Sequence, residues 1–310
     1  MKAGVPRIAK LVVIGVGLVG GSFALGLKAA GCVGTIVGVG RGRANLDAAA
    51  ALGIVDRAIT IDEDWTRELG DADVVLLAAP VAQFPALFEV MAGRLPPTAV
   101  LTDAGSTKQD VIAAARQHLG AALPRFVPGH PIAGTEHTGA AAAFATLYRD
   151  RNVVLTPLPE TDPAAVALVG ALWSACGARV QELDGGVHDR IFAAVSHLPH
   201  LLAFALVDLL AARPDAAQVF HFAASGFRDF TRIAASSPEM WRDIALANRE
   251  ALLVELGAYR AELDRIAAIV ATGDGGALEA VFTRAAAARR AWGEQFDAGP
   301  AVAANGSRKA

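Results

Sequence analysis

The chain has 310 residues, of which 54% are hydrophobic and 19% are charged, and this composition predicts a folded protein of one large or two smaller domains. The formal net charge of −3 argues against a nucleic-acid-binding surface. The two cysteines, Cys32 and Cys176, lie far apart in the sequence, so we expect buried apolar thiols in a reducing cytoplasm and no disulfide framework.

The N-terminus superficially resembles a signal peptide, because basic residues precede an apolar run. However, that run contains glycines at a fixed motif spacing and continues into an amphipathic pattern instead of a cleavage site. We therefore expect neither secretion nor a membrane span, since no clean apolar stretch reaches the roughly 20 residues that a span needs.

The first half of the chain alternates short β-branched runs with alanine-rich segments. This alternation predicts βαβ units and a mostly parallel, doubly wound sheet. Strands are expected at 10–15, 35–40, 73–79, 99–104, 125–129, 152–157 and 178–183. The helices expected between them include 19–30, 83–93, 107–119 and 163–176.

After about residue 185 the alternation stops, and 3.6-residue periodicity predicts only helices. We expect an α/β domain over 1–184, an all-helical domain over 185–298 and a disordered tail over 299–310. The segments 190–211 and 244–270 are too apolar for a chain of this size to cover alone, which predicts a homodimer built by the helical domain.

A dinucleotide-binding loop is predicted in "VVIGVGLVGGS", where Gly15, Gly17 and Gly20 lie between a strand and a helix. Gly15 would make the tight turn, Gly17 would let the backbone approach a pyrophosphate, and Gly20 would allow close helix–strand packing. The anion would bind N–H groups at the helix start, including those of Leu18 and Val19. The alternative is a glycine-rich turn with no ligand.

The acidic residue that usually ends the second strand of such a domain is absent, since Asp47 is the first acid in the chain. Gly40, Arg41 and Arg43 stand at that place instead. An acid would bind the ribose 2′-hydroxyl and repel a 2′-phosphate, whereas arginine can bind the phosphate. We therefore expect NADP to be favoured, with NAD possible; the alternative is two solvated surface arginines.

Two histidine patterns in the sequence invite a chemical interpretation. His130 lies in "FVPGHPIAGTEHTG", a glycine-broken loop after a strand, which is either an ordinary connection or a loop that presents His130 to a substrate. His197 and His200 in "SHLPHLL" have a spacing that suggests a metal. Pro199 between them and the lack of nearby HExxH or cysteine ligands argue against a metal site.

Four stretches together resemble the prephenate/arogenate (cyclohexadienyl) dehydrogenases of tyrosine biosynthesis. These are the glycine loop at 15–22, "DAGSTK" at 103–108, "GHPIAGTE" at 129–136, and "HDRIFAAVSHLPH" with "GFRDFTRIAASSPEMWRD" in the helical part. The resemblance covers about residues 10–255 and implies a Rossmann-type domain, a helical dimerisation domain and an active site between them. It also implies oxidative decarboxylation, in which C4 of the ring gives a hydride to the nicotinamide and CO2 leaves.

The resemblance also implies roles for individual residues. His130 and Ser106 match the catalytic pair, and a neutral imidazole suits proton removal near pH 7; the alternative for His130 is a loop histidine that caps backbone groups. Arg232 matches the clamp for a substrate carboxylate, and its neighbour Arg228 stands where the family often has lysine, four residues away and on the same face of a helix. The remaining matches are pocket residues (Ser196, His200, Trp241) and acids of a gating ionic network (Glu136, Asp189, Asp229).

Several alternatives stay open. Ser225 stands where many relatives have glycine, which puts backbone contacts at that point in doubt. Trp241 is alternatively a core residue, and each gating acid is alternatively a solvated surface charge. The residues do not separate prephenate from arogenate, and we expect any feedback by tyrosine to act at the active site.

Two other classes of protein compete with this interpretation. One is a two-domain NAD(P) reductase of the β-hydroxyacid or pyrroline-carboxylate type. The β-hydroxyacid enzymes usually rely on a catalytic lysine in the helical domain, and this chain has no lysine between Lys108 and Lys309. The other is a non-catalytic nucleotide-binding redox sensor, which would not need His130, Ser106 and Arg232 together.

Overall fold

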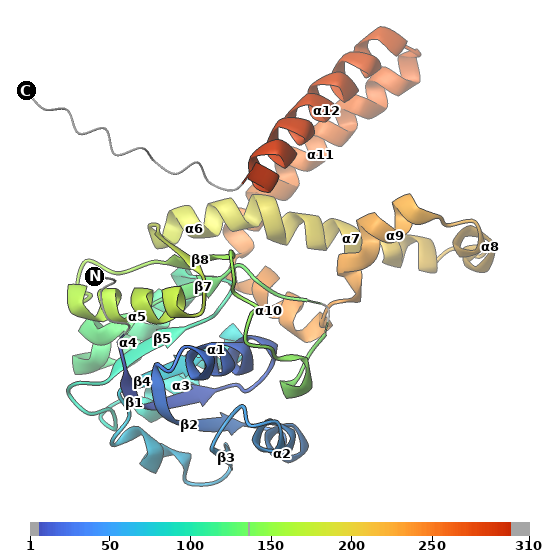
Figure 1. Ribbon diagram of the computed structural model, residues 1–310. Helices are drawn as coiled ribbons and strands as arrows, with labels where there is room; N and C mark the ends of the chain where they lie inside the picture. Colours follow the sequence, from blue (N-terminus) through green and yellow to red (C-terminus); the bar gives the residue numbers. More distant parts are fainter. Residues whose placement is uncertain (1–5, 136, 299–310) are drawn as a thin grey trace, which may run out of the picture. The chain divides into compact units, whose positions relative to one another are not determined.

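The computed structural model describes residues 6–135 and 137–298, so the tail expected at 299–310 lies outside the described residues. The first part of the chain forms a six-stranded parallel sheet with the order β3-β2-β1-β4-β5-β6 (Figure 1). Its strands are β1 (Ile8–Ile14), β2 (Val33–Gly40), β3 (Arg57–Thr60), β4 (Val74–Leu77), β5 (Val100–Asp103) and β6 (Phe126–Val127). The strand order reverses between β1 and β4, which is where doubly wound sheets bind their ligands.

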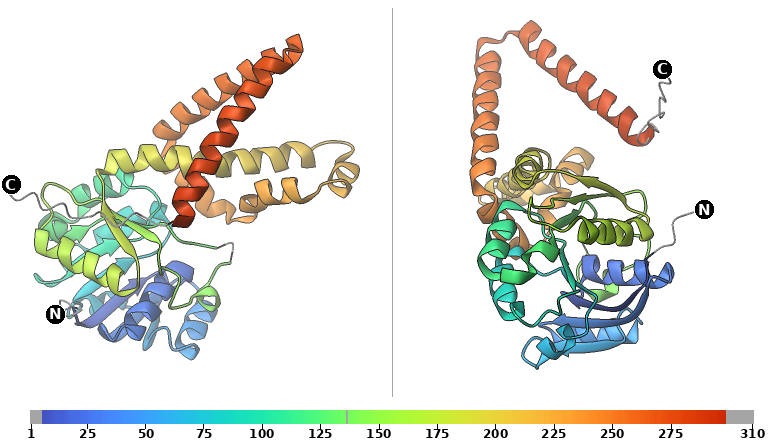
Figure 2. Two further views of the ribbon diagram at one scale, coloured as in Figure 1. Left: turned by 45° about the horizontal axis from the view of Figure 1, so that its top comes forward. Right: turned by 90° about the vertical axis from the view of Figure 1, so that its left-hand side faces the viewer.

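The sheet separates two apolar cores, because successive side chains of a strand point to opposite faces. On β1, Leu11 and Val13 belong to one core, whereas Val12 and Ile14 belong to the other. The first core also contains side chains of α1 (Leu18–Ala29), α2 (Arg43–Ala51) and α5 (Pro163–Ala175). The second contains side chains of α3 (Phe84–Met91) and α4 (Gln109–His118). Helices lie on both faces of the sheet (Figure 2). The predicted doubly wound α/β fold is confirmed.

A second, three-stranded sheet follows the first, and the sequence patterns do not separate the two. It contains β7 (Gly129–Pro131), β8 (Asn152–Leu155) and β9 (Arg179–Glu182), with β7 antiparallel to β8 and β8 parallel to β9. The single strand expected at 125–129 is therefore wrong. It divides at Pro128, which has no N–H to donate and lies where the chain passes from β6 to β7.

The rest of the described chain is helical. The helical elements are α6 (Gly185–Phe192), a π turn η5 (Ala193–His197), α7 (Leu198–Ala211), α8 (Ala216–His221), α9 (Ser225–Thr231), a 3-10 turn η6 (Arg232–Ala235), α10 (Pro238–Ala247), α11 (Arg249–Thr272) and α12 (Gly275–Ala298). The expectation that no apolar stretch is long enough to span a membrane is wrong for Gly185–Ala211. This continuous helical stretch of 27 residues passes that test by length and composition alone.

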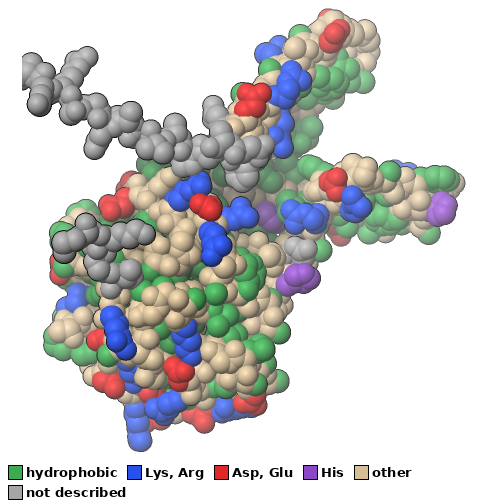
Figure 3. All heavy atoms as spheres, viewed as in Figure 1, with side chains coloured by type: hydrophobic (Ala, Val, Ile, Leu, Met, Phe, Trp, Pro, Cys, Tyr) green, Lys and Arg blue, Asp and Glu red, His purple; other side chains and the backbone are tan. Residues whose placement is uncertain are grey.

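The chain divides into two compact units, residues 1–253 and 254–310. In the described part of the second unit, the later turns of α11 and the whole of α12 are joined by a turn in which Gly273 has a positive φ of 68°. This helix pair leaves large apolar side chains exposed, including Phe282 and Trp292. Hydrophobic side chains form part of the visible surface of α12 (Figure 3).

Candidate active site

The loop between β1 and α1 is shaped by its glycines. Gly15 has a φ of +100°, and a Cβ there would lie 2.4 Å from the carbonyl oxygen that follows β4. A Cβ at Gly20 would lie 2.3 Å from the carbonyl oxygen of Gly15. At Gly17, by contrast, a Cβ would meet nothing within 4 Å. This open space adjoins the N-terminus of α1, so it fits a dinucleotide diphosphate held by N–H groups such as those of Leu18 and Val19.

The rim of this loop carries both predicted arginines, and each has an acidic neighbour. Arg43 forms an ion pair with Glu63 at 2.5 Å and lies 3.9 Å from Asp47. The Arg41 guanidinium lies 3.9 Å from the Glu239 carboxylate, and both of these side chains are largely exposed. Glu63 was not expected at this place from the sequence, because it follows β3 instead of β2.

A buried ion pair fixes both backbone groups of Gly129, the residue before His130. Lys108 and Asp103 contact each other at 2.5 Å, and both side chains are fully buried. Asp103 accepts a hydrogen bond from the N–H of Gly129, and the Lys108 ammonium donates to the carbonyl oxygen of Gly129. His130 itself pairs with Val154 of β8. The "DAGSTK" and "GHPIAGTE" motifs are therefore joined directly, just beyond the carboxyl ends of β5 and β6.

A chain of hydrogen bonds leads from His130 into the helical part. Its Nδ1 lies 2.8 Å from Nε2 of His188, and Nδ1 of His188 lies 2.8 Å from the Asp189 carboxylate. The same carboxylate accepts hydrogen bonds from the backbone N–H groups of Lys108 and Gln109, where α4 begins. The first turn of α4 is thus tied to α6 through one buried acid.

Burial keeps this cluster free of imidazolium charge. It lowers the pKa of His130 well below the ordinary value of 6.5, with His188, Lys108 and His197 lowering it further. Burial also lowers the pKa of His188, and it lowers that of His197 to about 4. The pKa of Asp189 is lowered, because hydrogen bonds from His188 and two backbone N–H groups outweigh the effect of its burial. At neutral pH the histidines are therefore neutral and Asp189 is ionised.

The π turn η5 aligns the two histidines that flank it. An unbroken α-helix turns about 100° per residue. In such a helix the side chains of His188 and His200 would therefore point in directions about 120° apart. A π turn takes up one additional residue and reduces that offset to about 20°. His188 and His200 consequently lie on nearly the same side of the Gly185–Ala211 stretch. Such turns are frequent at functional sites.

A second group of predicted residues gathers around His200. Its ring stacks on Trp241 with the ring centroids 3.6 Å apart, and its Nδ1 donates to the carbonyl oxygen of Ser196 at 2.9 Å. The pKa of His200 is lowered mainly by burial, and the positive charge of Arg232 lowers it further. The structure thus brings Ser196, His200, Trp241 and Arg232 into one neighbourhood.

Other predicted residues are placed apart from these groups. Arg228 does not share a helix with Arg232, because α9 ends at Thr231 and Arg232 begins η6. The Arg228 side chain is mostly exposed and pairs with Asp229 at 3.2 Å. Ser106 follows β5 and, among the described residues, forms no hydrogen bond to His130. Glu136 lies outside the described residues.

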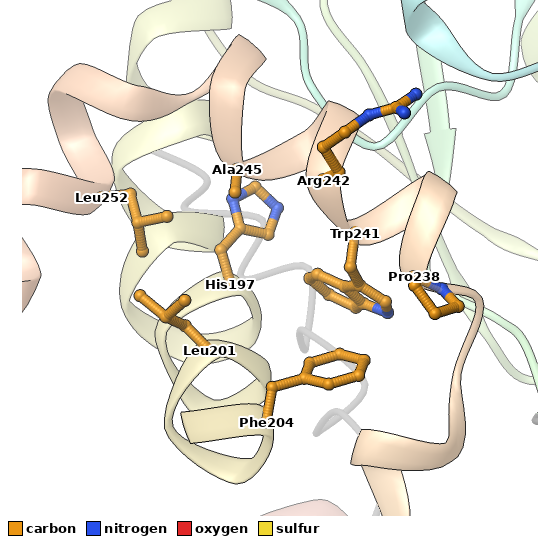
Figure 4. A pocket seen from close by; sticks show the side chains of 8 residues that line it. All are labelled: His197, Leu201, Phe204, Pro238, Trp241, Arg242, Ala245 and Leu252. Atoms are coloured by element: carbon orange, nitrogen blue, oxygen red, sulfur yellow. The ribbon is translucent and has the colours of Figure 1, made fainter. Parts of the chain in front are cut away.

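A cavity of about 240 Å³ lies beside the His200 group. Figure 4 shows His197, Leu201 and Phe204 on one side of it and Trp241 on the other. Its lining is almost wholly apolar, and neither Nε2 of His197 nor Nε1 of Trp241 has a hydrogen-bond partner in the described part of the chain. Arg242 also lines the cavity, so its polar groups are this guanidinium and the two ring nitrogens.

Three polar residues of the site are not singled out by the sequence patterns. His188 lies inside the "HDRIF" stretch but has no motif spacing to His130, and Lys108 gives no sign that its ammonium is buried. Asn248 donates to the carbonyl oxygen of Asp189 and lies 3.1 Å from His197. No group of three or more His, Cys, Asp or Glu side chains in residues 6–135 and 137–298 is arranged to hold a metal.

Comparison with known proteins gives a consistent result. Residues 23–182 match the nucleotide-binding domain of prephenate dehydrogenase, and residues 184–284 match the dimerization domain of the same enzyme. The cyclohexadienyl dehydrogenase of Zymomonas mobilis is 34% identical, over 94% of this chain and 98% of its own. The prephenate dehydrogenase of Bacillus subtilis is 36% identical, over 83% of this chain and 68% of its own.

Solved structures agree with these sequence matches. The prephenate dehydrogenase of Aquifex aeolicus, in complex with hydroxyphenyl propionate and NAD+, has a TM-score of 0.85 and 34% identity. That match covers 94% of this chain and 99% of the Aquifex chain. The arogenate dehydrogenase of Synechocystis has a TM-score of 0.75 and 29% identity, and the match covers 91% and 99% of the two chains.

The parallel sheet, the glycine loop and the partly buried histidine beyond the carboxyl ends of β5 and β6 are typical of a nicotinamide-dependent dehydrogenase with a helical second part. The chain belongs to the prephenate dehydrogenase family. It is an oxidoreductase that carries out NAD(P)-dependent oxidative decarboxylation in tyrosine biosynthesis. It forms a homodimer through its dimerization domain and acts on a small-molecule substrate.

Proposed function

We propose that His130 is the general base that takes the proton of the C4 hydroxyl group of prephenate or arogenate. The observation that carries this proposal is a partly buried imidazole, kept neutral by desolvation, just beyond the carboxyl edge of the sheet. As the proton leaves, the C4 hydride departs, the bond to the ring carboxylate breaks and the ring becomes aromatic. The bound nicotinamide dinucleotide supplies the hydride acceptor. Ser106, on the loop after β5, hydrogen-bonds the same hydroxyl group or orients His130.

The substrate carboxylate binds Arg232, and the pocket for the substrate side chain contains His200, Ser196 and Trp241. Support comes from the stacking of His200 on Trp241 and from the effect of the Arg232 charge on the pKa of His200. Arg228 and Asp229 form an exposed pair, which suits residues that change partners when substrate enters. Glu136 completes this gating network. Asp189 supports the base, because its carboxylate is buried and fully engaged.

Arg232→Ala is expected to raise KM for the substrate, because removing one partner of a charge pair costs about 2–5 kcal/mol in binding. Arg213→Ala is the matched control, since its guanidinium is half-exposed and already paired with Asp215, and we expect a change in KM below about threefold. Steady-state kinetics of both variants test the assignment. An unchanged KM in Arg232→Ala would show that Arg232 does not bind substrate.

For the cofactor, NADP is preferred over NAD by about tenfold, or roughly 1.4 kcal/mol. The preference rests on Arg41 at the end of β2 and on the absence of an acid at that strand end. It is limited by Glu63, which holds Arg43 in an exposed ion pair. The NAD+ complex of the Aquifex enzyme shows that this family also uses NAD.

The cofactor preference is tested by kcat/KM for NADP and NAD, with both prephenate and arogenate as substrates. Arg41→Ala should lose the preference for NADP, and Glu63→Gln should strengthen it, because Arg43 is then free to bind the 2′-phosphate. Equal or better use of NAD by the unmodified enzyme contradicts the proposal, as does unchanged use of NADP by Arg41→Ala.

The two parts divide this work. The α/β domain, residues 1–184, binds the dinucleotide and carries His130, and the helical domain, residues 185–298, supplies the substrate pocket and the dimer contacts. The enzyme works in the cytoplasm, where the buried thiols of Cys32 and Cys176 stay reduced.

A further inference from the structure

We propose that His188 is a positioning residue that fixes the tautomer of His130, with the proton on Nδ1 and the lone pair on Nε2. This inference rests on the proposed role of His130 as the base. It assigns a function to a side chain that touches His130 and that we do not expect to touch the substrate.

The argument starts at Asp189, whose carboxylate can only accept hydrogen bonds. One oxygen accepts from the N–H of Lys108 and the other from the N–H of Gln109, each at 2.8 Å. Nδ1 of His188 lies 2.8 Å from the first of these oxygens. Because an ionised carboxylate has no proton to give, Nδ1 of His188 must carry the proton.

The tautomer of His130 follows from that of His188. A neutral imidazole protonated on Nδ1 has its lone pair on Nε2, and this atom of His188 lies 2.8 Å from Nδ1 of His130. Nδ1 of His130 therefore donates the hydrogen bond, and its Nε2 keeps the lone pair. The opposite tautomer would place two lone pairs against each other in a buried space, which is strongly unfavourable.

Packing holds the rings of His130 and His188 in this arrangement. Phe192, one helical turn after His188, has its ring centroid 4.8 Å from that of His130 and 4.5 Å from that of His188. His188 is fully buried, and Asn248 holds the backbone at Asp189 by donating to its carbonyl oxygen. Asp189 is held in turn by the start of α4.

The arrangement also accounts for the charge that the reaction creates. When Nε2 of His130 takes the hydroxyl proton, the positive imidazolium keeps donating from Nδ1 to His188. His188 keeps its own proton and its bond to Asp189, so no proton moves along the chain. The negative charge of Asp189 lies behind the hydrogen-bonded ring of His188 and stabilises the new positive charge.

Two substitutions at His188 separate its two hydrogen bonds. The amide nitrogen of asparagine stands near the position of Nδ1, so His188→Asn keeps the donor to Asp189 but loses the acceptor for His130. The amide oxygen of glutamine reaches the position of Nε2, so His188→Gln keeps that acceptor. We expect His188→Asn to lower kcat by about 10²-fold with KM changed less than about threefold, and His188→Gln to lower kcat less than about tenfold.

The tautomer itself is measured by 15N spectra of histidine-labelled homodimer, with His130→Asn used to assign the His130 signals. The expected spectrum has a protonated Nδ1 and an unprotonated Nε2 in the unmodified enzyme and in His188→Gln, and a mixture of tautomers in His188→Asn. A His130 protonated on Nε2 in the unmodified enzyme overturns the proposal, even if neither His188 variant folds. Equal kcat losses in the two His188 variants also overturn it. The role of His130 as base is tested separately, because it fails only if His130→Asn keeps its turnover.

Discussion

At the scale of single residues, the account depends on a partly buried histidine that stays neutral because desolvation disfavours its charged form. The pKa of His130 is lowered well below 6.5 by burial and by the neighbouring His188, Lys108 and His197. A base works only when unprotonated, so kcat/KM should stay level as the pH falls from 8 to 6.5 and decline only below that. A profile measured from pH 5 to 9 checks this, and an acidic limb centred at or above 6.5 contradicts it.

The same burial makes the folded protein sensitive to acid. His197 has a folded pKa of about 4, whereas an unperturbed histidine titrates near 6.5. Between pH 6.5 and about 4 the unfolded chain therefore binds more protons than the folded protein. The free energy of unfolding consequently falls as the pH decreases through this range. His197 should contribute about 2 kcal/mol of this loss by pH 5. Urea unfolding at pH 7 and 5 measures it, and His197→Gln should show a smaller difference than the unmodified protein.

The buried Lys108–Asp103 pair gives a prediction about stability. Lys108→Met leaves the Asp103 carboxylate buried without its cation, which should cost about 3–5 kcal/mol in the free energy of unfolding. The matched control is the double variant Asp103→Asn with Lys108→Met, which removes the charge and keeps an amide oxygen for one of the two backbone N–H groups that Asp103 binds. Urea unfolding should find the double variant more stable than Lys108→Met, and the reverse order would show that the pair is not what holds this peptide.

At the scale of elements, the loop between β1 and α1 contains one glycine that folding needs and another that dinucleotide binding needs. Gly15→Ala places a Cβ against the carbonyl oxygen that follows β4 and should lower Tm, because its φ is also positive. Gly17→Ala meets no atom within 4 Å, so its Tm should be nearly unchanged. The added methyl group would instead stand where the diphosphate approaches, and we expect Kd for the dinucleotide to rise about tenfold or more. A normal Kd for the dinucleotide in Gly17→Ala would show that the diphosphate does not bind beside Gly17.

The π turn η5 is the second element with a testable role. Deleting Ala194 removes the additional residue, so Gly185–Ala211 should become an unbroken α-helix in which His188 and His200 keep their offset of about 20°. We expect kcat/KM to change less than about tenfold and the helix content by circular dichroism to stay the same. Inserting one alanine after Leu198 is the contrasting variant, because it turns His200 by about 100° relative to His188 and should lower kcat/KM by about 10²-fold or more. A large loss on deleting Ala194 would contradict this account of η5.

Six strands of the described chain could be predicted, because their β-branched runs alternate with helical segments, whereas the seventh, expected at 125–129, divides into β6 and β7. β3 could not, since its four residues carry no long apolar run. The family resemblance pointed to His130 and Arg232, and the glycine spacing pointed to the loop between β1 and α1, because each of these signals lies within a short stretch of sequence. They could not find His188 or the buried state of Lys108, because those depend on contacts between residues far apart in the chain, such as Lys108 with Asp189.

At the scale of the whole molecule, the helical part exposes large apolar side chains that a second copy can cover. In the first unit these include Leu209, Phe222 and Leu246. Light scattering at micromolar concentration should therefore give twice the chain mass of 31.9 kDa. A sharp single-chain mass would contradict the dimer.

The most direct test of the central claim is kcat of His130→Asn, measured with prephenate and with arogenate at saturating cofactor. If His130 is the base, kcat falls by about 10²- to 10⁴-fold, and substrate affinity measured by equilibrium binding stays similar. Asparagine keeps a polar group of smaller size at this position, so folding should be preserved and Tm is measured alongside. A variant that folds, binds substrate and keeps most of its turnover would show that another group takes the proton.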